Sequence, residues 1–270
     1  MNPRRASSRA QETSPPATPA KKRSPAWLGV AGLAVFLLAW EFLSRMGWIQ
    51  PLFFSSPTRV ARAAVFLAQN GLWRHVAVSG LEFALGLGLA IAFAIPLGFA
   101  LGWYRPLNAA LDTFVQLLNA TPRLALAPLI IIWFGLGLTS KVAVVFVGAF
   151  IPILLNTRAS LRQLPLPLVQ CARTFGATDR QIFLTVALPA SVPWIITGLR
   201  LATGHALVGV VVAELISSTA GLGYLISVST TTLQTDKVFV AVALLAGTGL
   251  VLSKLLERLE AHFDAWRPQV

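Results

Sequence analysis

The sequence predicts an all-α membrane protein with six transmembrane helices, and three observations support this fold class. Hydrophobic residues make up 56% of the 270 residues and charged residues only 12%, whereas a soluble domain carries roughly 25% charged residues. Several apolar runs are long enough to cross a bilayer as helices, which takes roughly 20 residues. The excess of basic residues, a net charge of +12, gathers at the ends of these runs. This placement favours orientation in a membrane over binding to nucleic acid.

The N-terminal region divides into a polar tail and a first span. Residues 1–25 are rich in proline, serine, alanine and basic residues and lack apolar periodicity, so they are predicted to be a disordered basic cytoplasmic tail. Residues 26–270 then form the transmembrane domain. The first span is the apolar run from Trp27 to Leu43. A cleaved signal peptide is a weaker interpretation, because the run ends in Trp40-Glu41-Phe42 rather than in small residues.

The second span is predicted from Val76 to Trp103. It follows a mixed segment, residues 45–75, in which a short amphipathic helix is expected after Ser56-Pro57-Thr58. The span contains Gly98 and Gly102 at the spacing of small residues that allow two helices to approach closely. We interpret these glycines as packing residues and assign them no further role.

The third span, Ala109 to Phe134, is predicted to be broken. Thr121-Pro122-Arg123 and Pro128 interrupt it, and each proline removes a backbone donor and obstructs the preceding helical turn. A broken helix at membrane depth is tolerated where it lines a cavity or is buried in protein. The break therefore marks a candidate position on a substrate path.

The remaining spans are predicted at Thr139–Leu155, Ala190–Ile216 and Val238–Leu256. A polar loop, Asn156–Leu188, separates the first two of these spans, and Gly221–Ile226 is an apolar outer loop expected to dip into the membrane surface. With this assignment more basic residues lie inside than outside, so both termini are predicted to be cytoplasmic.

Within the polar loop, residues 158–189 are predicted to form two short helices joined at a glycine. Proline at 165 and 167 precedes the first helix, and Gly176 suits a left-handed C-cap. Thr178 and Gln181 fit a capping box that starts a second helix, which Pro189 is expected to end. Such an elbow can act as a lever that docks into a partner, or it can be an ordinary cytoplasmic loop resting on lipid headgroups.

The same stretch resembles the EAA loop of ABC-importer permeases. Gln170-Cys171-Ala172-Arg173 stands where the motif opens, Gly176 follows, and nine residues lead to Val186-Ala187-Leu188-Pro189. Glutamine replaces the usual glutamate at 170 and cysteine the usual alanine at 171. Further stretches from residue 50 onward resemble the permeases of nitrate, sulfonate and taurine importers, namely Ser55-Ser56-Pro57, Ala94–Gly98, Pro128–Gly137, Gly148–Thr157, Thr197–Arg200 and Gly221–Ile226. Departures from that pattern include Glu82, Leu138, Asn119 and Ala120.

This resemblance implies the type I ABC importer permease fold and a set of partners. These are a second copy of the permease in a homodimer, two ATPase subunits that bind ATP and Mg, and a soluble substrate-binding protein. Within this chain it implies a coupling role for eight residues, which are Gln170, Cys171, Ala172, Arg173, Gly176, Val186, Leu188 and Pro189. The implied substrate is a sulfonate, taurine, nitrate or similar small compound, carried across the inner membrane.

Two alternatives stay open. Permeases for thiamine-precursor pyrimidines or other heterocycles share much of this pattern. A secondary transporter that needs no ATPase belongs to another class, and it would require inverted repeats or acidic ion sites in mid-span, which the sequence does not present.

The sequence predicts no catalysis and no metal or cofactor site in this chain. Gly135-x-Gly137-x-x-x-Lys141 lacks the glycine before lysine and the hydroxyl residue after it that a phosphate-binding loop requires. Catalytic elbows and zinc-binding helical motifs are absent from the sequence. A single cysteine and three scattered histidines give no metal-ligand spacing.

Ionisable residues inside the spans are the candidates for a substrate path, because a charge in mid-membrane costs at least roughly 2.5 kcal/mol. Arg200, His205 and Glu214 lie in the fifth span, and Arg123 lies at the break of the third. Arg200 and Arg123 are candidate attractors for an anion, with His205 as a polar neighbour. For Glu214 we favour a place near the outer interface, and for Asp112 a structural place near the inner end of its span.

Overall fold

The computed structural model describes residues 26–164 and 166–263, and these residues form helices and connecting turns without a strand. The helices are α1 (Ala26–Arg45), α2 (Pro51–Phe54), α3 (Pro57–Gln69), α4 (Leu72–Trp103), α5 (Arg105–Ala120), a 3₁₀ turn (Arg123–Leu126), α6 (Ala127–Phe134), α7 (Leu138–Arg162), α8 (Leu166–Thr174), α9 (Asp179–Ile182), a π turn (Phe183–Ala187), α10 (Leu188–Ser217), α11 (Leu222–Thr231) and α12 (Thr235–Phe263). The predicted tail, residues 1–25, the proline at 165 and Arg267 lie outside the described residues.

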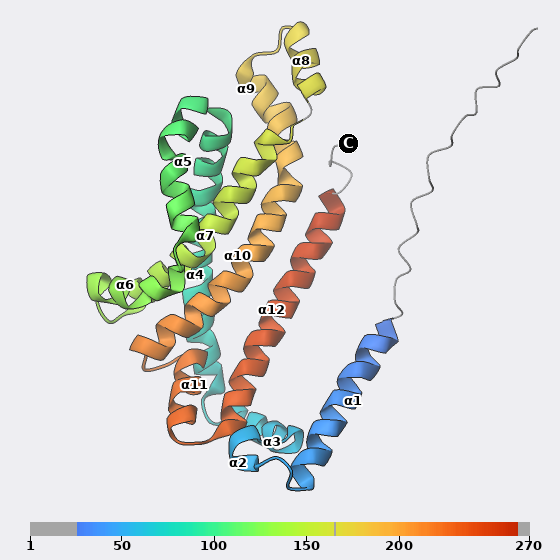
Figure 1. The fold of residues 1–270 in the computed structure, drawn as a ribbon, viewed down its shortest axis with the longest axis vertical. Helices are drawn as coiled ribbons and strands as arrows, with labels where there is room; N and C mark the ends of the chain where they lie inside the picture. Colours follow the sequence, from blue (N-terminus) through green and yellow to red (C-terminus); the bar gives the residue numbers. More distant parts are fainter. Residues whose placement is uncertain (1–25, 165, 264–270) are drawn as a thin grey trace, which may run out of the picture.

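Five helices are long and apolar enough to cross a membrane, and a bent pair completes a sixth span. The five are α1, α4, α7, α10 with its α9 extension, and α12. The pair is α5 with the segment Arg123–Phe134, and the two parts meet at an angle of 87°. The predicted break in the third span is therefore confirmed, and its sharpness places α6 across the direction of α5 (Figure 1).

The core is the contact of α4, α7 and α10 (Figure 1). Small residues bring these helices together: a Cβ atom added at Gly98 would lie 2.7 Å from Cβ of Thr157, and one at Gly86 would lie 2.5 Å from Cβ of Val145. Ala90, Ala94, Val145, Ala149, Ala202 and Ala206 are fully buried along the same seams. The interpretation of the α4 glycines as packing residues is confirmed.

The first span stands apart from this core. Most of its large apolar side chains are exposed, as they would be to lipid. Its C-terminal end is held at the start of α3, where the Glu41 carboxylate accepts hydrogen bonds from the backbone N–H of Thr58 at 3.1 Å and from its hydroxyl at 2.9 Å. The short helix expected in this segment is α3, and the Ser56 side chain caps its start. The ring of Trp40 lies 5.1 Å from that of Phe239 and links α1 to α12.

Three predicted boundaries are wrong. The fourth span does not end at Leu155, because α7 continues to Arg162, and Thr157, Ser160 and Leu161 are buried against its neighbours. From Leu222 onward the segment Gly221–Ile226 is not a loop, since Leu222 begins the helix α11, which packs on α10 and α12. The third error, at Pro189, concerns the coupling site and is described with it.

Candidate coupling site and polar path

The predicted elbow begins with α8, which projects at one end of the molecule beyond the long helices (Figure 1). None of its described residues is buried, and Phe175 just after it is 86% exposed. In the motif, Gln170, Cys171 and Arg173 are exposed and Ala172 is half-buried. A helix with no buried face inside its own chain is stabilised by a partner or by its caps, since nine residues are too few to form a stable helix alone.

The end of α8 is fixed by its backbone. Gly176 has φ +80°, the left-handed conformation that glycine adopts without strain. The N–H of Ala177 donates to the carbonyl of Ala172 at 3.0 Å, and that of Gly176 donates to the carbonyl of Arg173 at 2.9 Å. These two bonds form a Schellman motif, which satisfies carbonyls that the helix end would leave free.

The second arm begins at the predicted capping box. The hydroxyl of Thr178 accepts from the backbone N–H of Gln181, and the Gln181 side chain accepts from the backbone N–H of Thr178 at 2.8 Å. Arg173 on α8 pairs across the turn with Asp179 at 3.2 Å. The elbow therefore has a defined bend, although the exposed ion pair itself contributes little to stability.

The prediction that Pro189 ends this second arm is wrong. The helical run continues from α9 through the π turn into α10, and Pro189 lies in the first turn of α10. The N–H of Leu188 donates to the carbonyl of Phe183, five residues earlier, which widens the helix there into a π turn. The widened turn accommodates a proline that has no N–H to give. The elbow is consequently joined to the fifth span without a break, and Val186, Leu188 and Pro189 are half-buried at that joint.

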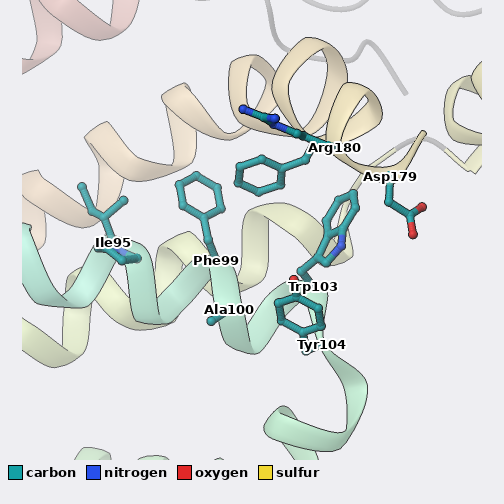
Figure 2. Close-up of a pocket in the computed structure, with 9 residues that line it drawn as sticks. Ile95, Phe99, Ala100, Trp103, Tyr104, Asp179 and Arg180 are labelled. Carbon is teal, nitrogen blue, oxygen red and sulfur yellow. The ribbon is translucent and has the colours of Figure 1, made fainter. Parts of the chain in front are cut away.

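An aromatic contact seats this joint on α4. The ring of Phe183 lies 5.3 Å from the rings of both Phe99 and Trp103, edge to face in each case. Ile182 beside it is almost fully buried. A cavity of about 560 Å³ opens next to the contact, and Figure 2 shows Phe99 and Trp103 reaching toward it from α4.

Only two of the three candidates for the substrate path lie together. Arg123 and His205 line one cavity of about 190 Å³ at the break between α5 and α6. Arg200 instead pairs with Glu260 of α12. Asp112 pairs with Arg158 of α7, in agreement with its predicted structural place.

A buried polar network where α7 begins and α10 ends was missed by the sequence reasoning. Lys141 Nζ lies 2.9 Å from the Glu82 carboxylate and donates to the Ser218 hydroxyl at 2.8 Å. Glu214, only 1% exposed, accepts from the Ser79 hydroxyl at 2.6 Å and from the N–H of Gly223 at 2.5 Å. Glu214 is therefore enclosed at a helix junction close to the end of α10.

The glycines of α11 make this enclosure possible. Gly221 has φ +125°, and a Cβ atom there would collide with the Glu214 carboxylate. Its N–H donates to Nδ1 of His75 at 3.0 Å, and the next N–H, from Leu222, donates to the Ser79 hydroxyl at 2.8 Å. One signal in the sequence pointed to part of this network, since Glu82 in the second span and Lys141 in the fourth are opposite charges within apolar segments.

A bundle of long apolar helices with a helical elbow projecting at one end defines the class of the chain as a multi-pass membrane protein. The family model of the binding-protein-dependent transport system inner membrane component matches residues 90–267, and the chain belongs to this family. It is thus a permease of the ABC importers, a transport component rather than an enzyme.

Two curated relatives and one solved structure describe the similarity. The chain is 37% identical to the putative aliphatic sulfonates transport permease protein SsuC of Escherichia coli K12, covering 93% of this chain and 96% of the relative. It is 32% identical to the taurine transport system permease protein TauC of the same organism, covering 90% of each chain. The fold matches the MetNI methionine ABC transporter in an inward-facing conformation with a TM-score of 0.60 at 18% identity, over 73% of this chain and 96% of that chain. This likeness confirms the type I importer fold.

Proposed function

We propose that this permease carries a small sulfonate, taurine or a similar organic anion across the inner membrane. The similarity to SsuC and TauC over most of the chain supports this substrate class. Arginine at a cavity beside a broken span is consistent with an anion on the path. ATP and Mg are bound by the partner ATPase in this proposal, and this chain contributes no cofactor site.

The elbow from α8 to the π turn is the proposed coupling lever. Its first arm exposes Gln170, Cys171 and Arg173, as a segment that docks into an ATPase groove must. Its second arm continues into α10 without a break, so a displacement of the elbow is transmitted along the fifth span. The single observation that carries this role is this continuity through Pro189.

A second copy of the chain is the proposed partner within the membrane. The end of α6 and the turn after it expose Ile132, Trp133 and Leu136, each more than two thirds exposed. The rest of the described chain leaves this surface without a cover, and a homodimer with its lipid surroundings would bury it. The proposed orientation places the elbow and both termini in the cytoplasm, on the side of the ATPases.

Uptake by the assembled importer in proteoliposomes tests the proposal. The permease is reconstituted with its ATPase, and labelled taurine or ethanesulfonate is supplied with the binding protein on the outside and ATP inside. We expect uptake that requires ATP, the ATPase and the binding protein. Uptake of a pyrimidine but of neither sulfonate would contradict the substrate class, and uptake at full rate without the ATPase would contradict the mechanism.

A further inference from the structure

The cavity at the break of the third span is built from three separate helical segments. Its wall consists of Thr121, Pro122, Arg123, Leu124, Gly148 and His205. The break lies partway along the bundle, where α6 turns across the direction of α5 (Figure 1). Irregular backbone at membrane depth is tolerated where it lines a cavity. Gly148 contributes no side chain to this space, and a Cβ atom there would lie 3.3 Å from the carbonyl oxygen of His205.

The guanidinium of Arg123 is a cation in this cavity, and no carboxylate of the described residues pairs with it. Its Nη1 atom is buried and has no hydrogen-bond partner in residues 26–164 and 166–263. Two other arginines within the bundle are neutralised, Arg158 by Asp112 and Arg200 by Glu260. A buried polar atom without a partner is costly, and more so when it is charged. The structure therefore presents an anion-binding group that the described chain does not satisfy.

His205 adds a second polar group to the wall of this cavity. Its Nδ1 atom lies 2.9 Å from the carbonyl oxygen of Leu201, and because a carbonyl can only accept, this nitrogen carries the proton. The Nε2 atom is then available to a ligand. In the neutral ring it accepts a hydrogen bond, which suits the amino group of an aminosulfonate.

We infer that this cavity is an anion subsite on the permeation path, in which Arg123 binds the oxyanion head of a small organic anion. A guanidinium presents two parallel N–H donors to such a head group. The volume of about 190 Å³ is many times the roughly 10–15 Å³ that a single water needs, which leaves room for a sulfonate head. The inference deepens the proposed function and rests on it, because it assigns the place where the substrate's charge is held.

Thiol labelling measures the charge preference of the cavity without relying on transport. The chain has a single cysteine, Cys171, which is exposed on the elbow. The variant Thr121→Cys in a Cys171→Ala background places one thiol in the cavity wall. The assembled importer is treated with two methanethiosulfonate reagents of similar size, the anionic sulfonatoethyl and the cationic trimethylammonioethyl derivative, and the ratio of their reaction rates is recorded.

We expect the anionic reagent to be favoured and Arg123→Gln to lower the rate ratio at least about tenfold, which corresponds to about 1.4 kcal/mol. Arg123→Lys should retain most of the preference, and Arg59→Gln, which removes the same charge from an exposed position on α3, should leave the ratio unchanged. Ethanesulfonate should slow labelling in the parent and not in Arg123→Gln.

A ratio that is independent of Arg123 would overturn the inference even if the importer takes up sulfonates. A thiol at 121 that reacts with neither reagent, with or without ATP, would overturn it as well, because the cavity would not be on a water-accessible path. The reverse result separates the two proposals: an Arg123-dependent ratio in an importer that takes up no sulfonate would refute the proposed substrate class and leave the anion subsite standing.

Discussion

Gly176 is the residue at which the addition of a side chain is expected to affect coupling most. Its φ of +80° is the conformation in which a β-branched residue is most strained, while a Cβ atom added there would meet no atom within 4 Å. A substitution there therefore acts on the backbone bend of the elbow and not on packing. This separates coupling from the stability of the membrane helices.

We expect Gly176→Val to abolish ATP-driven uptake while leaving membrane insertion intact. The strain is about 1–2 kcal/mol or more, and it is relieved when the bend opens and α8 leaves its docking orientation. Uptake in proteoliposomes and the amount of folded permease in membranes are the measurements. Gly88→Val is the matched control, since Gly88 is helical with open space around it and should tolerate the same side chain. Unchanged uptake in Gly176→Val would contradict the lever role.

The buried ion pair of Lys141 and Glu82 gives a second prediction at the scale of single residues. Lys141→Met leaves the Glu82 carboxylate, which is 1% exposed, without its cation. Breaking a buried pair on one side costs about 3–5 kcal/mol, whereas replacing both partners is far less costly. We expect Lys141→Met to lower the thermal unfolding temperature in detergent markedly and Lys141→Met with Glu82→Gln to recover most of the loss. If the double variant were as unstable as the single one, the pair would not be the cause.

At the scale of helices, the sequence was informative wherever a local rule decides the structure. The capping box at Thr178, the left-handed Gly176 and the short helix near Pro57 follow from neighbouring residues, and each is present. The apolar runs predicted the spans, and Pro122 predicted the break in the third one. Sequence reasoning alone thus reached the fold class and the shape of the elbow.

The predictions from sequence were wrong where contacts between distant segments determine the structure. The end of α7 is helical because Thr157 and Leu161 pack against α4, although the polar residues there suggested a loop. Pro189 continues a helix because the π turn before it removes the need for its N–H. The position of Glu214 depends on the glycines of α11, which come after it in the chain and fold back onto it. None of these is visible in a local window.

The joint between the elbow and the bundle predicts different roles for two phenylalanines, Phe183 and Phe175. Phe183→Ala should remove the edge-to-face contacts with Phe99 and Trp103 and destabilise the permease by about 3–5 kcal/mol. Phe175→Ala should leave the stability of the isolated permease unchanged, because Phe175 is 86% exposed, and should weaken retention of the ATPase. Thermal unfolding of the permease and co-purification of the ATPase are the two readouts. Equal effects of both variants in either assay would refute this division.

At the scale of the whole molecule, the single cysteine reports the orientation of the chain. Cys171 lies exposed on α8, at the end of the bundle where α12 also ends (Figure 1). The proposed topology predicts that a membrane-impermeant thiol reagent labels Cys171 in inverted vesicles and not in intact spheroplasts. The Cys171→Ala variant gives the background signal. Labelling from the outside only would reverse the proposed topology.

The long helices divide into a packed trio, which is α4, α7 and α10, and spans at its periphery. The first span contacts the other helices through its C-terminal end and through Trp40, and α12 has few buried residues. The match to the MetNI transporter covers 73% of this chain, and the match to the permease family begins only at residue 90. The family match therefore falls on the segment from α4 to α12 and leaves α1 outside it.

The seams of α4, α7 and α10 have a mechanical consequence. Where glycine and alanine bring one backbone directly against another, no long side chain is present to change rotamer and allow two helices to slide. In the proposed coupling the trio moves as a single strut, and a push delivered at the elbow is converted into tilting of the whole chain.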